Sequence, residues 1–505
     1  MKLPTNPTTR TLIALSLCAL AVAAAAHSVH RYWEEQAEIA SWPKSRRGHV
    51  PPAPTPSPTD ATPTSLSPRP SDSLEVDRFL RIIPRTRGVV TEEELILLAQ
   101  TLPKLRQEWK PTHAVMLLET AMRAPELAPV LFPFLEKMTG QKLGDSQMDW
   151  LPWIWREIPD VHPDYLEFKG KLYSQIDSEF MRYFEGHPEA RIRADEIVWG
   201  GVKIEGIPRL SHPPALPASE ATWMGDDDIV FGLKINGESR AYPRRIYAYH
   251  ELIQDQLGGV EIVTPYCTMC ESVNVYETQL NGVSYDLRTS GFIYRSNKLM
   301  YDVATHSMWS SVAGEPVVGS LVKQKLKLKR HPVQTATWKA WREAHPDTTV
   351  ISTDTGFQRD YREGAAYAEF HQSSRLWYPV PKADDRLPEK HLVLAIPSDD
   401  PGRLPLAIDT DHLHEHPVYV ARNGGHSSLV LTDPDTGSRV YAIPEIEFSE
   451  SIANQTVTDS TGRIWTITDE ALTSPEAEKC PRIPAHEIYW LPWVNHQPTT
   501  VLLPE

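Results

Sequence analysis

Two cysteines separated by two residues are the clearest candidates for chemistry in this sequence. Cys267 and Cys270 lie in the segment Y-C-T-M-C, between an alternating stretch at 260–264 and a valine-containing stretch at 273–275. Alternation of apolar and polar residues is typical of half-buried strands, so the sequence predicts a hairpin with both thiols at its tip. Thiols at this spacing can close a tight disulfide or bind one metal ion between them.

The context of the pair favours one kind of thiol chemistry over the others. A thioredoxin-type pair opens a helix, whose N-terminus lowers the thiol pKa, whereas a strand pattern follows Cys270. A hairpin tip is more typical of a metal-binding knuckle, and thiolates select soft metals such as zinc and copper. We therefore expect a zinc or copper site, with a small structural disulfide and thiol–disulfide exchange as the alternatives.

Several other residues are candidates for the same site. His250 is the candidate third metal ligand, and Glu251 the candidate partner of that histidine or a base. A buried histidine bonded to the backbone is an equally good interpretation of His250. His306 offers a soft ligand that can join copper. Cys480 is either a buried inert thiol or, if two parts of the chain pack face to face, an additional ligand.

A second group of metal-ligating residue types lies at 409–416. We expect a solvated loop there, with a surface metal site as the alternative. In an extended chain its three histidines would face one side. The residues concerned are Asp409, Asp411, His412, His414, Glu415 and His416.

Charge and cysteine content exclude two classes of protein. The chain has 505 residues, with 51 Lys and Arg against 66 Asp and Glu, a net charge of −15. This acidic balance argues against nucleic acid as a partner, because phosphates require basic surfaces. Four cysteines in a chain of this length do not make a disulfide-dense scaffold.

Residues 1–30 are expected to form a signal sequence or a membrane anchor. Lys2 and Arg10 precede an apolar run at 12–26, which is short for a bilayer span of about 20 residues. Aromatic and basic residues that suit a membrane interface follow, and then the Pro-rich end of a linker at 31–71. The sequence therefore favours a single-pass anchor with a periplasmic or extracellular domain in the cell envelope. Secretion after cleavage is the alternative.

Residues 72–190 read as a helical domain without chemistry of its own. Thr91 followed by three glutamates predicts a capped helix start. Helical spacing of apolar residues continues at 113–123, 127–139 and 164–184. We interpret this part as a support or interaction domain.

From residue 191 onward the pattern changes to short strands, and two stretches of the chain resemble each other. We infer two related β-rich lobes from an internal duplication, a first lobe at 191–375 and a second, degenerate lobe at 376–505. The matching segments are 228–246 with 390–408, 260–276 with 418–431, 302–309 with 459–465, and 338–350 with 490–501. In this comparison residues 423–426 fall where the first lobe has its cysteines, so the thiols are not needed to build a lobe. The expected fold class is α+β.

Five motifs occur together in the first lobe. They are A-Y-P at 241–243, H-E at 250–251, Y-C-T-M-C-E at 266–271, S-G-F-I-Y-R-S-N at 290–297, and Y-D-V-A-T-H-S-M-W at 301–309. Their order and spacing resemble an uncharacterised bacterial family, domain of unknown function 3179. Its usual pattern has proline at the position of Thr268 and glycine at that of Glu271. The resemblance implies export or membrane attachment but no established activity. The motif residues Tyr266, Ser290, Asn297 and His306 are expected to surround the thiol pair.

Three functions follow from these observations. The first is a membrane-tethered protein of the cell envelope that binds zinc or copper through Cys267, Cys270 and His250. The second is a thiol–disulfide redox protein that uses the same two cysteines. The third is a non-enzymatic scaffold for an envelope protein partner. No Ser-His-Asp order, phosphate loop or paired-carboxylate motif stands out in the sequence.

Overall fold

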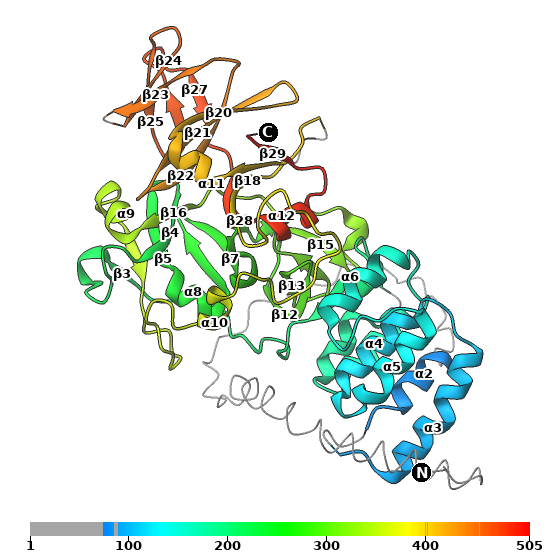
Figure 1. The fold of residues 1–505 in the computed structure, drawn as a ribbon. Coiled ribbons are helices and arrows are strands. Elements are labelled where there is room, and N and C mark those ends of the chain that lie inside the picture. Colours follow the sequence, from blue (N-terminus) through cyan, green and yellow to red (C-terminus); the bar gives the residue numbers. More distant parts are fainter. Residues whose placement is uncertain are drawn as a thin grey trace, which may run out of the picture. The chain divides into compact units, whose positions relative to one another are not determined.

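The computed structural model describes residues 74–84, 89–186, 188–398, 400, 402–453 and 455–504. The predicted anchor at 1–30 and linker at 31–71 lie outside these residues. In the part of the chain that is described, no helix has the length and apolar character needed to cross a membrane. Contacts divide the chain into two compact units, Met1–Asp145 with His162–Leu172, and Ser146–Val161 with Tyr173–Glu505 (Figure 1).

The first unit is helical. Its helices are α2 (Leu74–Arg81), α3 (Glu92–Gln107), α4 (His113–Arg123), α5 (Ala128–Thr139), the 3-10 turn η1 (Pro125–Leu127) and most of α7 (Tyr165–Ser174). The predicted cap of α3 is confirmed, because the Thr91 hydroxyl accepts a hydrogen bond from Glu94 N and the Glu94 carboxylate accepts one from Thr91 N. Gly140 ends α5 in the left-handed conformation that glycine adopts at low cost.

The single helix predicted at 164–184 is wrong. The helix α7 ends at Ser174, and a separate 3-10 turn, η2 (Ser178–Tyr183), begins after Asp177. The Asp177 carboxylate accepts a hydrogen bond from Glu179 N. A capping aspartate starts a new helical turn, so the apolar spacing continues across a break in the backbone hydrogen bonding.

The second unit opens with α6 (Gln147–Glu157), a short turn and then the sheets of the first lobe. Residues 194–196 form the 3-10 turn η3 (Ala194–Glu196), and Ala218–Glu220 forms η4. One sheet contains β16 (Gln334–Thr337), β4 (Ile229–Ile235), β5 (Glu238–Pro243), β17 (Thr349–Ile351) and β3 (Ala215–Pro217). Another contains β2 (Leu210–Ser211), β6 (Leu252–Leu257), β7 (Val260–Cys267) and β8 (Ser272–Val273), with β9 (Tyr276–Glu277) paired to β7. A further sheet contains β1 (Ile197–Trp199), β12 (Leu287–Tyr294), β13 (Asn297–Asp302), β14 (Met308–Ser310) and β15 (Glu315–Val318), and a small one pairs β10 (Gln279–Leu280) with β11 (Val283–Ser284). The helices are α8 (Arg244–His250), η5 (Thr268–Cys270), η6 (Val322–Gln324), α9 (Trp338–Ala344) and α10 (Ala368–Gln372).

The second lobe has its own sheets, and among the described residues no sheet combines strands of both lobes. One sheet of the second lobe contains β28 (His486–Tyr489), β18 (Leu392–Ile396), β19 (Leu406–Asp409) and β29 (Val501–Leu503). Another contains β20 (Val418–Asn423), β21 (His426–Asp433) and β22 (Gly437–Ile443). A third contains β23 (Phe448–Ala453), β24 (Thr456–Asp459), β25 (Ile464–Ile467), β26 (Ala471–Thr473) and β27 (Lys479–Pro481). Its helices are α11 (Thr410–Glu415) and α12 (Trp490–His496). The predicted α+β class is confirmed.

Two of these sheets have the same strand pattern. In the first lobe the order is β16-β4-β5-β17, and in the second it is β28-β18-β19-β29, each with antiparallel pairs followed by one parallel pair. A short helix, α9 or α12, connects the first and last strand of each set. The indole of Trp341 in α9 donates a hydrogen bond of 2.9 Å to the Thr348 hydroxyl, and that of Trp493 in α12 donates one of 2.9 Å to Thr500.

Gly232 in β4 permits the close packing of α9 on its sheet. A Cβ atom at this position would overlap the six-membered ring of Trp341. We expect Gly232→Ala to lower the free energy of unfolding by about 1–3 kcal/mol, because a packed core does not absorb an added methyl group. Urea unfolding measures this loss. Gly225→Ala is the matched control, since its nearest neighbouring atom lies 3.6 Å from the added Cβ. Equal stability of the two variants would contradict this packing.

Candidate functional site

Both cysteines lie in the turn between β7 and β8. The strand β7 ends at Cys267, η5 carries Cys270, and Cys267 pairs with Ser272 across the turn. The predicted hairpin with the thiols at its tip is confirmed. Glu271 adopts the left-handed conformation, with φ of 51°, at the position where the family pattern has glycine. Glycine reaches this conformation without a Cβ penalty, so Glu271 holds the turn at an added cost in backbone strain.

The two thiols face each other in a buried site. Their sulfur atoms lie 3.4 Å apart, and both thiols are free. The Cys270 thiol donates a hydrogen bond of 2.7 Å to the carbonyl oxygen of Ser296, and the Cys267 sulfur lies 3.8 Å from the same oxygen. Cys267 is 5% exposed and Cys270 is fully buried. The pair is therefore a dithiol whose sulfurs need only a small approach to bond to each other.

A tight turn brings the Ser296 carbonyl to the thiols. Arg295 and Ser296 have φ of 49° and 61° between the paired residues Tyr294 and Asn297. Two central residues with positive φ are typical of the type I′ turn that joins twisted strands. The Asn297 amide then donates a hydrogen bond of 3.2 Å to the Ser272 hydroxyl, which ties this turn to β8.

Ser290 and Gly291 form an irregularity in β12 that supports the same turn. The register between β12 and β13 shifts between Thr289 and Ile293. The Ser290 hydroxyl donates to the Leu299 carbonyl at 2.6 Å and accepts from Phe292 N at 3.1 Å. Gly291 has φ of 83°. The S-G motif therefore shapes the strand that carries the Ser296 carbonyl.

A buried ion pair lies beside the thiols. The Lys298 ammonium is 2.6 Å from the Glu251 carboxylate and also donates to the Glu251 carbonyl at 2.7 Å. Glu251 caps α8 in the left-handed conformation, and its carboxylate accepts a hydrogen bond of 2.7 Å from the Tyr367 hydroxyl. Both charged side chains are nearly inaccessible. The Glu251 carboxylate thus contacts Lys298 and Tyr367 rather than His250, and its alternative role as a base stays a prediction.

The two thiols differ in acidity. Burial alone would raise the pKa of Cys267, but the hydrogen bond with Cys270 and the positive charge of Lys298 outweigh it and lower that pKa. Burial and the hydrogen bond with Cys267 raise the pKa of Cys270 well above its ordinary value. In such a pair the more acidic thiol is the nucleophile, so Cys267 is the candidate nucleophile and Cys270 the second thiol.

His250 already has partners at both ring nitrogens. Its Nδ1 lies 2.7 Å from the Pro208 carbonyl oxygen, and its Nε2 lies 2.5 Å from the Tyr361 hydroxyl. The ring is fully buried, and burial lowers its pKa to about 4. These contacts match the backbone-bonded histidine that the sequence offered as the alternative to a ligand. Within the described residues, the groups of His, Cys, Asp and Glu close enough to share a metal ion do not include the two thiols.

We expect the neutral form of His250 to make stability depend on pH. The unfolded histidine has its ordinary pKa near 6.5, whereas the folded one titrates at about 4. The unfolded state therefore binds more protons between these values, and stability is lost as pH falls from 6.5 to 4, by roughly 3 kcal/mol in total. Urea unfolding of the wild type and His250→Gln at pH 7 and pH 4.5 measures this. The variant should lose less stability, and an equal loss would contradict the assignment.

The other predicted site residues lie at different distances from the pair. Tyr266 is buried in the same turn, where burial and the Glu271 carboxylate raise its pKa well above the ordinary value. His306 stacks on Tyr301 at the far end of β13, with ring centroids 6.0 Å apart. Cys480 lies in β27 and packs in a core cluster of the second lobe that does not contain the thiol pair. Ser290, Asn297 and Tyr266 are thus brought to the site, and His306 and Cys480 belong to other contacts.

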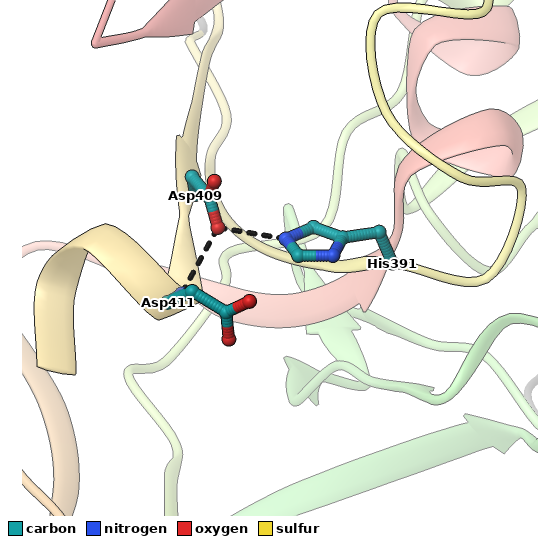
Figure 2. A group of neighbouring side chains, drawn as sticks. All are labelled: His391, Asp409 and Asp411. Carbon is teal, nitrogen blue, oxygen red and sulfur yellow. Dashed lines mark hydrogen bonds and ion pairs between the residues drawn. The ribbon is translucent and has the colours of Figure 1, made fainter.

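The segment at 409–416 is a helix rather than the predicted loop. Asp409 caps α11 and accepts a hydrogen bond of 2.9 Å from Asp411 N. The imidazole of His391 lies 2.7 Å from the Asp409 carboxylate, and these two side chains with Asp411 bring three ligand atoms within 4.8 Å of one another (Figure 2). Because Asp409 already caps the helix and binds His391, a structural role accounts for these contacts.

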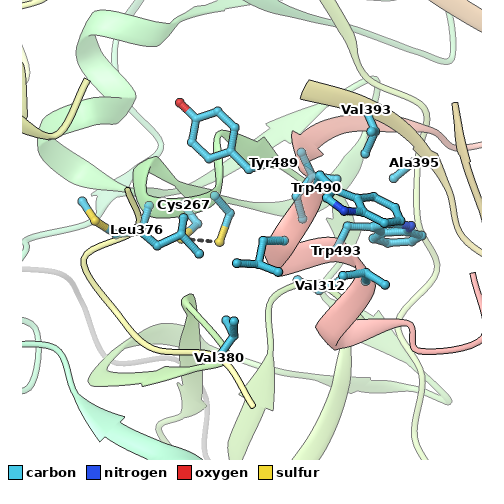
Figure 3. Packing of buried hydrophobic residues seen from close by; sticks show 14 of the residues in the cluster. Cys267, Val312, Leu376, Val380, Val393, Ala395, Tyr489, Trp490 and Trp493 are labelled. Atoms are coloured by element: carbon cyan, nitrogen blue, oxygen red, sulfur yellow. Dashed lines mark hydrogen bonds between the residues drawn. The ribbon is translucent and has the colours of Figure 1, made fainter. Parts of the chain in front are cut away.

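Residues from both lobes enclose the thiols. Cys267, Met269 and Cys270 share one core cluster with Tyr489 and Trp490 of the second lobe (Figure 3). The connector, residues 352–391 between β17 and β18, contributes the remaining cover, through Tyr367, Phe370, Leu376 and Val380. Sequence reasoning missed Lys298 and Tyr367. Lys298 directly follows the S-N end of a family motif, and that position was the available signal.

The comparisons with known proteins identify one relationship. A family described as "Protein of unknown function (DUF3179)" matches residues 204–500, more than half of the chain. The match spans the thiol turn and continues through most of the second lobe. No curated protein and no solved structure gives a significant match.

Proposed function

Because the chain belongs to the DUF3179 family, whose description assigns no activity, we propose from the site itself that Cys267 and Cys270 perform thiol–disulfide exchange. The observation that carries this proposal is the pairing of two free thiols 3.4 Å apart with opposite shifts in pKa. Exchange requires a thiolate nucleophile and a second thiol that resolves the mixed disulfide. This pair has both.

The proposed reaction transfers two electrons between the pair and a substrate disulfide. The Cys267 thiolate attacks one sulfur of the substrate, forming a mixed disulfide and releasing the other substrate sulfur as a thiolate. Cys270 then loses its proton and attacks the Cys267 sulfur, which closes the 267–270 disulfide and releases the second substrate thiol. The substrate is reduced and the pair oxidised, and the reverse sequence oxidises a substrate dithiol.

Access to Cys267 depends on the connector. Tyr367 is held by its hydrogen bond to Glu251, and Phe370 packs into the thiol cluster. Under the proposal, displacement of this connector, whose one regular element among the described residues is the short helix α10, admits the substrate, because the strands on either side of the turn are fixed by the sheet. Segments with little regular backbone hydrogen bonding open locally at lower cost than sheets.

The direct test is exposure of the native, reduced protein to oxidised glutathione, followed by alkylation and peptide mapping. We expect a Cys267–Cys270 disulfide to form without denaturant, while Cys480 stays unmodified until the protein unfolds. Cys480 is a suitable internal control because it is 3% exposed and lies in a separate core. A pair that reacts only together with Cys480 in unfolding conditions would rule out exchange.

Soft-metal binding by the same two sulfurs is a second proposal. It is favoured by the hydroxyls of Thr268 and Ser296, which are buried beside the thiols without a hydrogen-bond partner and suggest room for a bound species. Zinc usually takes four ligands, whereas copper(I) is satisfied by soft sulfur ligands, so copper is the better candidate of the two. Adding copper(I) or zinc to the apoprotein and measuring bound metal by mass spectrometry decides this. Binding that persists in Cys267→Ser would contradict it.

The setting of the protein is also a proposal. We infer that the N-terminal segment holds the domain at the cell envelope. Proteins in this oxidising compartment carry disulfides that a thiol pair can exchange with. An envelope protein that carries a disulfide or dithiol is then the expected partner. Scaffold function without thiol chemistry is the remaining alternative. It requires the partner to bind the Cys267→Ser, Cys270→Ser double variant with the same affinity as the wild type.

The two lobes are proposed to derive from a duplication. The matching strand orders of their four-stranded sheets and the Trp341 and Trp493 contacts support it. Strand order pairs β7 with β21, because each follows a Gly-Gly turn, at 258–259 and 424–425. The thiol turn then corresponds to residues 433–436 rather than to 423–426. Each turn faces the other lobe, as β8 lies against β28 and β22 against β16.

A further inference from the structure

A cavity of about 250 Å³ lies between the lobes, beside the thiol turn. Its first-lobe wall includes Phe231, Arg244 and Glu271, its second-lobe wall includes Glu487 and Tyr489, and the connector adds His371. Glu271 directly follows Cys270, and Tyr489 packs in the thiol cluster. The cavity therefore lies next to the proposed redox pair, but it is built from residues that the thiol chemistry does not use.

Two polar side chains that line this cavity, the partly exposed Glu487 and the exposed His371, are not held by hydrogen bonds or ion pairs within the described part of the chain. The side chains of Glu487 and His371 make no hydrogen bond or ion pair with another described residue, although both line the cavity. Burial and the nearby Glu271 carboxylate raise the pKa of Glu487 to about 7. The Glu487 side chain is partly exposed, so its carboxylate loses only part of its hydration, and a bound cation would offset that loss.

The positive charges around the cavity are already engaged. Arg244 binds Glu363 at 2.8 Å and Glu271 at 3.4 Å. The Lys390 ammonium donates to the carbonyl oxygens of Phe370 and Ser373 at 2.6 and 2.7 Å. Burial lowers the pKa of His371, so its ring stays neutral near pH 7. The charge left without a partner is thus the carboxylate of Glu487.

We propose that this cavity binds a small organic cation, a primary alkylamine, with its ammonium group on Glu487 and its carbon chain against the rings of Phe231 and Tyr489. An ammonium matches a carboxylate in a charge-assisted hydrogen bond, and aromatic rings offer apolar surface that buries an alkyl chain. The volume is below the range of about 300–1,000 Å³ that accommodates drug-sized ligands. A chain of about four carbons therefore suits the cavity, and larger amines do not.

The test is calorimetric titration of the native protein with butylamine, with butanol and butyrate as probes of matched length. Butylamine is expected to bind at least about tenfold more tightly than butanol, which corresponds to one charge-assisted contact of roughly 1.4 kcal/mol. Its affinity should rise from pH 6 to pH 8 as Glu487 ionises, because Arg244, Lys390, His371 and Glu271 do not gain positive charge over that range. Equal binding of butylamine and butanol, or tighter binding of butyrate, would overturn the proposal.

Two variants separate this inference from the others. Glu487→Gln should bring butylamine affinity down to that of butanol, whereas the control Glu470→Gln, at an exposed position, should leave it unchanged. The wild-type comparison of the three probes decides the question even where Glu487→Gln fails to fold. Cys267→Ser should bind butylamine like the wild type, so failure of the thiol proposal and failure of the amine proposal are distinguishable. Unchanged affinity in a folded Glu487→Gln would assign the amine to another site.

Discussion

Serine in place of Cys267 is expected to abolish disulfide exchange, whereas serine in place of Cys270 should leave Cys267 reactive. The pKa of Cys267 is lowered and that of Cys270 is raised, so the thiolate forms more readily at position 267 than at position 270. With oxidised glutathione, Cys270→Ser should accumulate a stable mixed disulfide at Cys267, because the thiol that resolves it is gone. Cys267→Ser should accumulate none. Peptide mapping after acid quenching measures both outcomes.

The rate of alkylation by iodoacetamide provides the quantitative form of this prediction. In Cys270→Ser, the Cys267 thiol is expected to react at least about tenfold faster than the Cys270 thiol does in Cys267→Ser, because the fraction of thiolate changes tenfold for each unit of pKa. Cys480→Ser is the matched control and should behave as the wild type. Equal rates in the two variants, or trapping at Cys270 alone, would contradict the assigned nucleophile.

Removal of the Lys298 ammonium is expected to be the most destabilising single change near the site. Lys298→Met leaves the Glu251 carboxylate buried beside the Tyr367 hydroxyl without its cation. Breaking a buried ion pair in this way costs about 3–5 kcal/mol. Urea unfolding should show a loss of this size. The double variant Lys298→Met, Glu251→Gln should recover most of it, because no unpaired charge then remains.

The double variant also tests the link between this ion pair and the thiols. The double variant removes the Lys298 charge, which lowers the pKa of Cys267, together with the smaller opposing effect of the Glu251 charge. The pKa of Cys267 should therefore still rise, by less than the loss of Lys298 alone would cause, and alkylation at pH 7 should slow even though the protein is folded. The pH dependence of alkylation measures this shift directly. A folded double variant with an unchanged pH profile would show that the ion pair as a whole supports the fold without a net effect on the pKa of Cys267.

Local sequence signals were sufficient for the elements that position the site. The alternation at 260–264 predicts β7, the Thr91 cap predicts the start of α3, and the two-residue spacing predicts a turn that brings the thiols together. These features depend on residues close in sequence, whose spacing fixes backbone hydrogen bonding. The family motifs added Ser290 and Asn297, which the structure brings to the same turn.

The remaining features depend on contacts between distant parts of the chain. The Ser296 carbonyl reaches Cys270 from 26 positions away, and Tyr367 reaches Glu251 from 116. No periodicity encodes such a contact. The same limit applies to the proposed duplication, because sequence comparison aligns the thiol turn with 423–426, whereas the strand order used in the proposal aligns it with 433–436. It also explains His250, whose oxygen partners, Pro208 and Tyr361, lie 42 and 111 positions away.

The reduction potential of the Cys267–Cys270 pair is the measurement that decides whether the two cysteines perform thiol–disulfide exchange. The native protein is equilibrated with glutathione buffers of stepped potential, quenched with acid, alkylated and mapped by mass spectrometry. Structural disulfides have potentials below about −300 mV, and exchanging pairs have higher ones. We expect a reversible two-electron transition above about −300 mV in the folded protein, absent in Cys267→Ser and unchanged in Cys480→Ser. A pair that never exchanges without denaturant, or one with a potential below that limit, would contradict it.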